Sequence, residues 1–184
     1  MYKICQTEQS FQRQRELEKG LLQLMLKQRY EDISVSDLCA YMQIPRKAFY
    51  RYFSSKDGAL HALLDHIMMD FQFGEDHGLS GSALKELDRY FAFWYEQKDL
   101  LTALMRSSLS GILVERATNY ALKERMMPRY MLSWDANNQG IAISFAICGL
   151  MSMVIQWHQQ GFLQTPREMS QIASAMLTRP LLPT

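Results

Sequence analysis

Apolar residues recur at three- and four-residue steps along most of this chain, which is the spacing of amphipathic helices. The pattern predicts a first helix over residues 9–29, marked by Leu17, Leu21 and Leu24. Later helices with this period are expected over residues 56–73, 82–98, 100–108, 112–131, 139–160 and 166–177. No run has the two-residue alternation of a strand. The predicted fold class is therefore all-α, with about nine helices in total.

Two short helices are predicted between the first helix and residue 54. Ser34 and Asp37 have the spacing of a capping box, which opens a helix over residues 35–42. Proline fits only the first turn of a helix, so a third helix is expected from Pro45 to about Tyr52. Apolar side chains are placed to pack the two together: Leu38, Ile44, Phe49 and Phe53. This arrangement is typical of a helix-turn-helix.

Composition narrows the class of protein. Apolar residues make up 48% and charged residues 21% of the 184 residues, as in a folded globular protein. The first residues contain no apolar signal segment, so we expect a cytoplasmic protein. The apolar stretch 141–155 is interrupted by serine and glycine and is shorter than the roughly 20 residues that span a bilayer, so we interpret it as a buried helix.

Residues for catalysis or metal binding are not found in a recognisable pattern. The three cysteines, Cys5, Cys39 and Cys148, are far apart and are expected to be free thiols, the last two in the core. The four histidines have no metal-ligand spacing, and neither a nucleophile elbow nor a phosphate-binding glycine loop is present. We therefore expect no enzyme, no metal and no cofactor.

Charge is concentrated in one short stretch. The net charge is only +1, yet residues 43–56 carry Arg46, Lys47, Arg51 and Lys56 and no acid. A local basic patch on a nearly neutral protein suggests one face that binds phosphate. Arg46 and Lys47 lie in the first turn of the third helix, where side chains of a helix-turn-helix reach base edges in the major groove.

Two blocks around this patch resemble the DNA-binding signature of the TetR family. They are Ile33-Ser34-Val35-Ser36-Asp37-Leu38 and Phe49-Tyr50-Arg51-Tyr52-Phe53-Ser54-Ser55-Lys56-Asp57, and their separation is also similar. The chain departs from the family pattern at Gln43, where a glycine is usual, at Pro45, where a small hydroxyl residue is usual, and at Ala59, where a larger apolar residue is common.

The resemblance implies roles for individual residues. Ser34, Tyr50 and Lys56 would hold DNA phosphates, Tyr52 would add another such contact, and Phe53 would pack between two units. The DNA-binding set that we predict is Ser34, Ser36, Arg46, Lys47, Tyr50, Tyr52 and Lys56. We expect a helix-turn-helix domain over residues 1–54 and a helical ligand-binding and dimerisation domain over residues 55–184.

A helix-turn-helix usually binds a palindromic site on double-stranded DNA as a two-fold dimer. Residues 139–160 are apolar on nearly all sides, which predicts a helix buried between two subunits. The segment from Trp157 to Met169 also resembles the C-terminal part of TetR-like regulators, which implies a four-helix dimer interface. The predicted interface residues are Phe145, Cys148, Met151, Ile155, Met169, Ile172 and Met176.

The middle helices are rich in aromatic residues and methionine, which suits a small apolar or aromatic ligand. The resemblance implies a ligand pocket between the fifth and eighth helices, although plain core packing explains each residue equally well. The predicted lining is Phe91, Trp94, Tyr95, Met105, Tyr120, Met127, Trp134 and Cys148. We expect a repressor released by this effector. An activator, or a helical protein-interaction module without ligand-controlled repression, stays open as an alternative.

Overall fold

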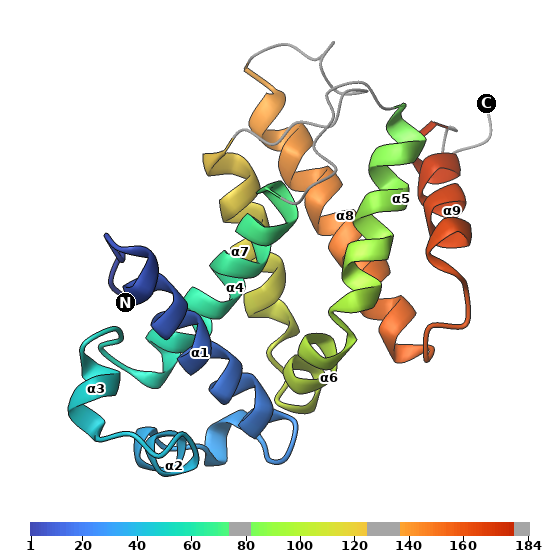
Figure 1. Cartoon of the computed structure of the whole chain (residues 1–184). Coiled ribbons are helices and arrows are strands. Elements are labelled where there is room, and N and C mark those ends of the chain that lie inside the picture. The colour runs from blue at the N-terminus through green and yellow to red at the C-terminus, as the bar shows by residue number, and fades with distance from the viewer. Residues whose placement is uncertain (74–81, 125–136, 179–184) are drawn as a thin grey trace.

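The computed structural model describes residues 1–73, 82–124 and 137–178. These residues form nine α-helices and one short 3-10 helix (Figure 1). In chain order they are α1 (Glu8–Met25), η1 (Tyr30–Asp32), α2 (Val35–Tyr41), α3 (Arg46–Tyr50), α4 (Lys56–Phe73), α5 (Ala83–Glu96), α6 (Lys98–Arg106), α7 (Ser110–Lys123), α8 (Gln139–Gln159) and α9 (Pro166–Thr178). Within the described ranges there is no strand, and the all-α fold class is confirmed.

Local sequence chemistry sets most helix boundaries. Ser34 and Asp37 form the predicted capping box at the start of α2. Thr165 caps α9 in the same way, because its hydroxyl accepts from the Glu168 amide while the Glu168 carboxylate accepts from the Thr165 amide. The first helix ends at Met25 rather than near residue 29, since Arg29 takes an extended conformation that leads into η1. Residues 125–131, predicted to end the seventh helix, lie outside the described residues.

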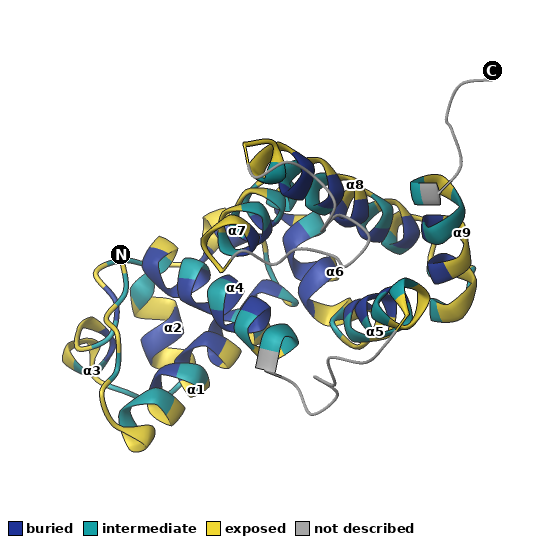
Figure 2. Cartoon of the chain, turned by 90° about the horizontal axis from the view of Figure 1, so that it is seen from above, coloured by how far each residue is buried: buried dark blue, intermediate teal, exposed yellow. Residues whose placement is uncertain are grey.

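The helices are arranged around α4, which runs between two groups (Figures 1 and 2). At one end lie α1, α2 and α3, and α1 packs along α4. At the other end α5 packs against α9, and α7 packs against both α4 and α8. The short helix α6 contacts α1, α7 and α8, so it joins the two groups beside α4. Helix α7 therefore contacts α4 directly, and α6 contacts α1 directly.

The hydrophobic core is continuous from α1 to α9. Aromatic rings occupy its densest regions, with Phe49 and Phe53 fully buried near α3, and Phe91, Trp94 and Trp157 fully buried between α5 and α8. Aromatic rings of α5 and α8 meet edge to face, and the centroids of the Phe91 and Trp157 rings are 5.9 Å apart. The apolar periodicity of the sequence therefore corresponds to one extended core.

A buried contact between a carboxylate and an imidazole joins α1 to α4. The Glu18 carboxylate lies 2.9 Å from Nδ1 of His66, and both side chains are almost completely buried. Arg15 reaches from α1 to both Glu18 and Asp70. Burial raises the pKa of Glu18, and the hydrogen bond from His66 opposes that shift. Removing one partner would leave a buried polar group without its hydrogen bond, so this contact contributes to the packing of α1 on α4.

The eighth helix is longer than the apolar stretch seen in the sequence. It has 21 residues, and the mean hydropathy of an 18-residue window within it is 1.8, so its length and composition would suffice to cross a membrane. Core helices of soluble proteins can be equally long and apolar, and α8 packs along α7 with Ala142, Ala146 and Val154 buried. The helix predicted over residues 139–160 therefore ends one residue earlier than expected, and its packing against α7 agrees with a core role.

Candidate nucleic-acid interface

The candidate site is the exposed surface of α2, α3 and the start of α4. The capping box of α2 orders its first residue, because the Ser34 hydroxyl oxygen accepts the Asp37 amide at 3.1 Å and Asp37 accepts the Ser34 amide at 2.8 Å. The Ser34 oxygen is thereby used as an acceptor, and its hydroxyl hydrogen stays available for an outside acceptor. Ser36 is also exposed, on the first turn of the same helix.

The turn between α2 and α3 keeps a left-handed residue although it lacks glycine. Gln43 has φ 53°, the Gln43 amide donates to Ala40 and the Ile44 amide donates to Cys39. These two hydrogen bonds make a Schellman motif, in which the left-handed position is usually a glycine. The departure at Gln43 therefore leaves the geometry of the turn intact, at the conformational cost that a side chain pays in this region.

The third helix presents a polar outer face on a single buried anchor. Phe49 is completely buried, whereas Arg46, Lys47, Tyr50 and Arg51 are exposed, and α3 is coloured largely as exposed in Figure 2. Pro45, with φ −69° and an extended ψ of 145°, directly precedes the helix and makes no capping hydrogen bond with its side chain. The helix runs from Arg46 to Tyr50, shorter than the predicted span from Pro45 to about Tyr52. The Arg46 guanidinium donates to the Tyr50 hydroxyl at 3.3 Å, so these two side chains cover one side of the helix together. The face carries positive charge and hydroxyl donors, a combination that suits phosphates and base edges.

Lys56 is placed differently from the other predicted cations. Its ammonium donates to the backbone carbonyl oxygens of Tyr30 at 2.5 Å and Ile33 at 2.6 Å, and it lies 4.1 Å from the centre of the Tyr30 ring. The neighbouring Asp57 accepts a hydrogen bond from the Tyr30 hydroxyl at 2.6 Å. The start of α4 thus holds the loop that leads into α2, and one of the three ammonium hydrogens is left for a phosphate.

Tyr52 is half-buried and packs against the core rather than standing free on the surface. Its ring lies 6.4 Å from that of Phe53, which is 1% exposed. The backbone around it is paired with the N-terminus, since the Lys3 amide donates to the Tyr52 carbonyl. Sequence reasoning missed this N-terminal contribution, because the residues that make it are about 50 positions away from α3.

The predicted ligand-pocket residues do not meet in one place among the described helices. Phe91 and Trp94 are fully buried in the core of α5, where Tyr95 is partly exposed and stacks on Trp157. A second group lies on α7 and α8, where the Tyr120 hydroxyl donates to Gln72 of α4 and Cys148 lies beside Thr118. Met105 is half-buried on α6, and Met127 and Trp134 lie outside the described residues.

The predicted dimer residues divide by exposure. Phe145, Ile172 and Met176 are 66%, 39% and 55% exposed, which leaves them available to a partner. Ile155 and Cys148 are half-buried. Met151 and Met169 are buried in the chain's own core, where the Tyr90 hydroxyl donates to the Met151 sulfur. Ile141, one turn before Phe145, is 69% exposed and is a further exposed apolar side chain of α8.

The three cysteines are free thiols, as predicted. Cys39 is buried, Cys148 is half-buried, and the Cys5 thiol donates to the Gln14 side chain at 2.9 Å. Among the residues that the structure describes, no three His, Cys, Asp or Glu side chains are grouped so that they could hold a metal ion.

Comparison with known proteins places this chain among regulators. A family model described as a transcriptional regulator C-terminal region, TetR_C_8, matches residues 82–179, just over half of the chain. No protein with curated function matches the sequence closely enough to count as a relative.

Several solved structures share the fold. The dihydroxyacetone kinase operon activator DhaS is similar with a TM-score of 0.62 and 16% identity, over 90% of this chain and 93% of that one. The fatty acid degradation regulator FadR from Bacillus halodurans gives a TM-score of 0.65 and 13% identity over 91% and 95%. The TetR family repressor AlkX from Dietzia sp. strain DQ12-45-1b, implicated in biodegradation of n-alkanes, gives 0.54 and 19% over 87% and 90%.

Proposed function

The chain belongs to the TetR family of transcriptional regulators, and on this premise we propose that it binds a specific sequence of double-stranded DNA through α2 and α3. The observation that carries the proposal is the outer face of α3, where Arg46, Lys47, Tyr50 and Arg51 are exposed around one buried anchor. The stretch from Gln43 to Lys56 holds no acid that would repel a phosphate. A face of this kind fits the major groove.

Within this proposal the contacts divide into two kinds. Arg46 and Lys47, in the first turn of α3, contact base edges and set the sequence preference. The phosphate contacts come from Ser34, Ser36, Tyr50, Tyr52 and Lys56. Ser34 donates its free hydroxyl hydrogen and Lys56 its third ammonium hydrogen, since their remaining capacity is used inside the protein.

The functional unit in this proposal is a cytoplasmic homodimer on a palindromic operator. Residues 1–54 form the DNA-binding domain and residues 55–184 the dimerisation and ligand-binding domain. The exposed apolar side chains of α8 and α9 support the interface: Ile141, Phe145, Ile172 and Met176. A monomer in water gains by covering such side chains, and a two-fold contact gives the half-site spacing that a palindrome needs.

We assign the protein as a repressor released by a small apolar or aromatic effector bound among α5 to α8. Aromatic and sulfur-containing side chains there support that chemistry. The effector releases DNA only if it binds one arrangement of the two DNA-binding domains more tightly than the other. Because the similar folds include an activator, DhaS, and a repressor, AlkX, activation is the second candidate.

The decisive experiment is selection of bound sequences from a random duplex pool with the purified protein, followed by a salt titration on the selected duplex. We expect an enriched palindrome and a binding constant that falls steeply with salt. The matched control is the Arg46→Ala, Lys47→Ala double variant, which should lose the enrichment and keep weak binding. No enrichment at any salt concentration would refute DNA recognition and favour a protein-interaction module.

A further inference from the structure

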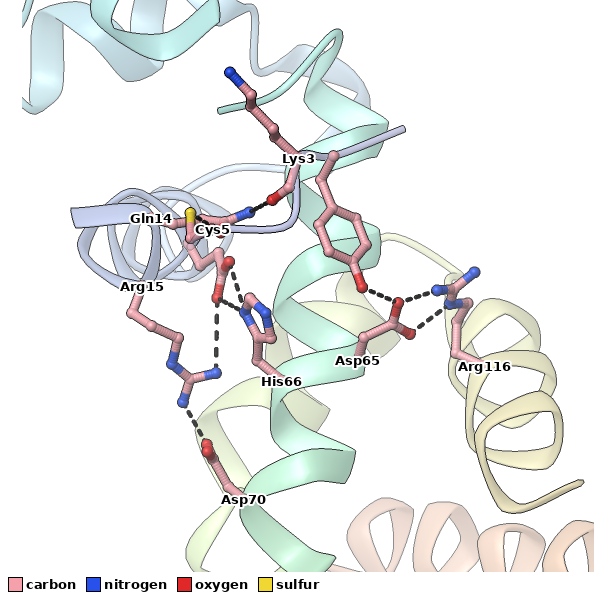
Figure 3. Close-up of polar contacts among 10 residues, drawn as sticks. Lys3, Cys5, Gln14, Arg15, Asp65, His66, Asp70 and Arg116 are labelled. Atoms are coloured by element: carbon pink, nitrogen blue, oxygen red, sulfur yellow. Dashed lines mark hydrogen bonds and ion pairs between the residues drawn. The ribbon is translucent and has the colours of Figure 1, made fainter. Parts of the chain in front are cut away.

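The first five residues lie against α1 and α4 and pair with the link between α3 and α4. Figure 3 shows Lys3 and Cys5 beside Gln14 of α1. We call residues 1–5 the N-terminal strap. They make no helix of their own, yet Tyr2 forms the antiparallel bridge with Phe53. Because these contacts join the end of α3 to the helices behind it, the strap is a candidate for controlling where α3 sits.

On one side the strap pairs with the link between α3 and α4. The Lys3 amide donates to the Tyr52 carbonyl at 2.9 Å, and the amide and hydroxyl of Ser54 both donate to the Met1 carbonyl, at 3.2 and 2.7 Å. A helix of five residues such as α3 does not form in isolation, because nucleation costs more than one turn returns. Its position therefore depends on what holds its two ends.

On the second side the strap satisfies a buried amide of α1. Gln14 is 1% exposed, its side-chain nitrogen donates to the Lys3 carbonyl at 3.2 Å, and its side-chain oxygen accepts the Cys5 thiol at 2.9 Å. A buried amide without partners would be destabilising. The strap therefore satisfies both the nitrogen and the oxygen of this amide, which accounts for a polar side chain in the interior.

On the third side Tyr2 connects the strap to α4 and α7. The Tyr2 ring packs edge-on against His66, and its hydroxyl donates to Asp65 at 2.7 Å. Asp65 also accepts two hydrogen bonds from the Arg116 guanidinium of α7. Figure 3 shows the Asp65 carboxylate facing the guanidinium of Arg116. One carboxylate thus joins the strap to a helix of the region matched by the regulator family model.

Gly58, in the first turn of α4, provides the space for the strap. A Cβ atom at this position would lie 2.5 Å from the Met1 carbonyl oxygen, closer than such atoms approach. Glycine is an unfavourable residue inside a helix relative to alanine. The close approach of the strap is a physical reason for a glycine here.

We propose that the N-terminal strap is a positioning element for α3, and that Tyr2, Asp65 and Arg116 link the placement of α3 to α7. The proposal rests on the DNA-binding function proposed above. The strap acts without touching DNA: it holds Tyr52 and Ser54, and through them the end of the helix that enters the groove. Loss of the strap loosens α3 and reduces the fraction of molecules ready to bind.

The test compares Tyr2→Phe, which removes only the hydroxyl, and Gly58→Ala, which displaces the strap by its Cβ. The controls are Tyr90→Phe on α5, which removes a buried hydroxyl that donates to Met151, and Gly111→Ala on α7, where an added Cβ meets nothing within 4 Å. Hydrogen exchange of residues 51–58 in the DNA-free protein is the first readout. We expect residues 51–58 to exchange about twofold to tenfold faster in both test variants, which corresponds to the loss of one hydrogen bond. The exchange rate should be unchanged in the controls. Unchanged exchange in both would overturn the proposal.

Binding to the selected duplex is the second readout. Both variants should bind about twofold to tenfold more weakly, with the same salt slope as the parent protein. A shallower slope would mean that the strap contacts phosphates directly and would overturn the positioning role. If the parent protein binds no duplex at all, the proposed function fails, whereas the exchange measurement still decides whether the strap holds residues 51–58.

The link to α7 has its own measurement. Arg116→Gln should also speed exchange of residues 51–58, and its effect should be smaller in a Tyr2→Phe background than alone, since both changes act through Asp65. Fully additive effects would overturn the link and leave the strap as a local clamp.

Discussion

The ammonium nitrogen of Lys56 lies 2.6 Å from the carbonyl oxygen of Ile33, the residue directly before the N-cap of α2. Lys56, at the start of α4, therefore holds the backbone that leads into α2. The same side chain is predicted to hold a DNA phosphate, so its replacement should have two effects that the replacement of a surface cation does not.

Lys56→Met is expected to lower both stability and DNA affinity. It removes hydrogen bonds from a charged donor to Tyr30 and Ile33, which for a half-buried group corresponds to about 1–2 kcal/mol in the free energy of unfolding. Lys47→Met, an exposed cation on α3, is the control and should leave stability unchanged. Urea denaturation measures the difference. Equal stability of the two variants would show that the carbonyl contacts contribute nothing.

Arg46→Ala and Lys47→Ala should relax the base preference, whereas Tyr50→Ala should weaken binding to all sequences alike. A good base contact is worth about 1–3 kcal/mol of discrimination, and a phosphate contact carries no sequence information. Competition between the selected duplex and single-base variants separates the two kinds of loss. Identical behaviour of all three variants would contradict this division of roles.

Gln43→Gly is expected to stabilise the protein by roughly 0.5–1 kcal/mol. The residue has φ 53°, a region in which glycine avoids the steric cost that a side chain pays. Gln97→Gly is a matched control, because Gln97 has φ −88° and gains nothing from glycine. Thermal unfolding of both variants gives the comparison. A lower melting temperature for Gln43→Gly would mean that the glutamine side chain makes contacts that outweigh its backbone strain.

Phe145→Asp should convert the dimer to monomer. The side chain is 66% exposed on α8, and a charge there would have to be buried against the partner. Ala92→Asp, on an exposed position of α5, places the same charge away from the proposed interface and should leave the dimer intact. Sedimentation velocity distinguishes the two. A dimer that tolerates Phe145→Asp places the interface elsewhere.

The capping box of α2 should make stability depend on pH in the acid range. Hydrogen bonds with Ser34 lower the pKa of Asp37 below its ordinary value of 3.8. A lowered pKa means that the stabilisation is complete above pH 3.8 and is lost as the pH falls through the lower, folded value. The melting temperatures of the parent protein and Asp37→Asn should therefore differ at pH 6 and converge toward pH 3. A constant difference over this range would rule the carboxylate out as its source.

Helix boundaries were predictable because their causes are local. Ser34 with Asp37, and Pro45, each act within about one turn, and the structure places α2 and α3 accordingly. The inward side of α8 was not predictable, because that helix is apolar all round and no periodicity marks the side facing α7. Met151, predicted at a subunit interface, lies on this inward side.

The contacts of the strap could not be predicted, because they join residues that are far apart in the sequence. Tyr2 and Asp65 are 63 residues apart, and Glu18 and His66 are 48 apart, so neither pair leaves a pattern in a short window of sequence. Glutamine is a residue type usually found at the surface, and only the structure reveals that the Gln14 side chain is buried. The polar face of α3 was visible in the sequence, whereas the groups that hold α3 in place were not.

The five residues of α3 span little more than one turn, so the recognition surface is not a separable peptide. A synthetic copy of Arg46–Tyr50, or the same side chains grafted onto a long helix, would lack the Gln43 turn, the Phe49 anchor and the pairing of Tyr52 with Lys3. We therefore predict that the proposed operator preference can be transferred to another scaffold only as a block that includes α1, α2 and the first residues of the chain. Chimeras that exchange α3 alone would carry the contacting side chains but would lack the groups that position them.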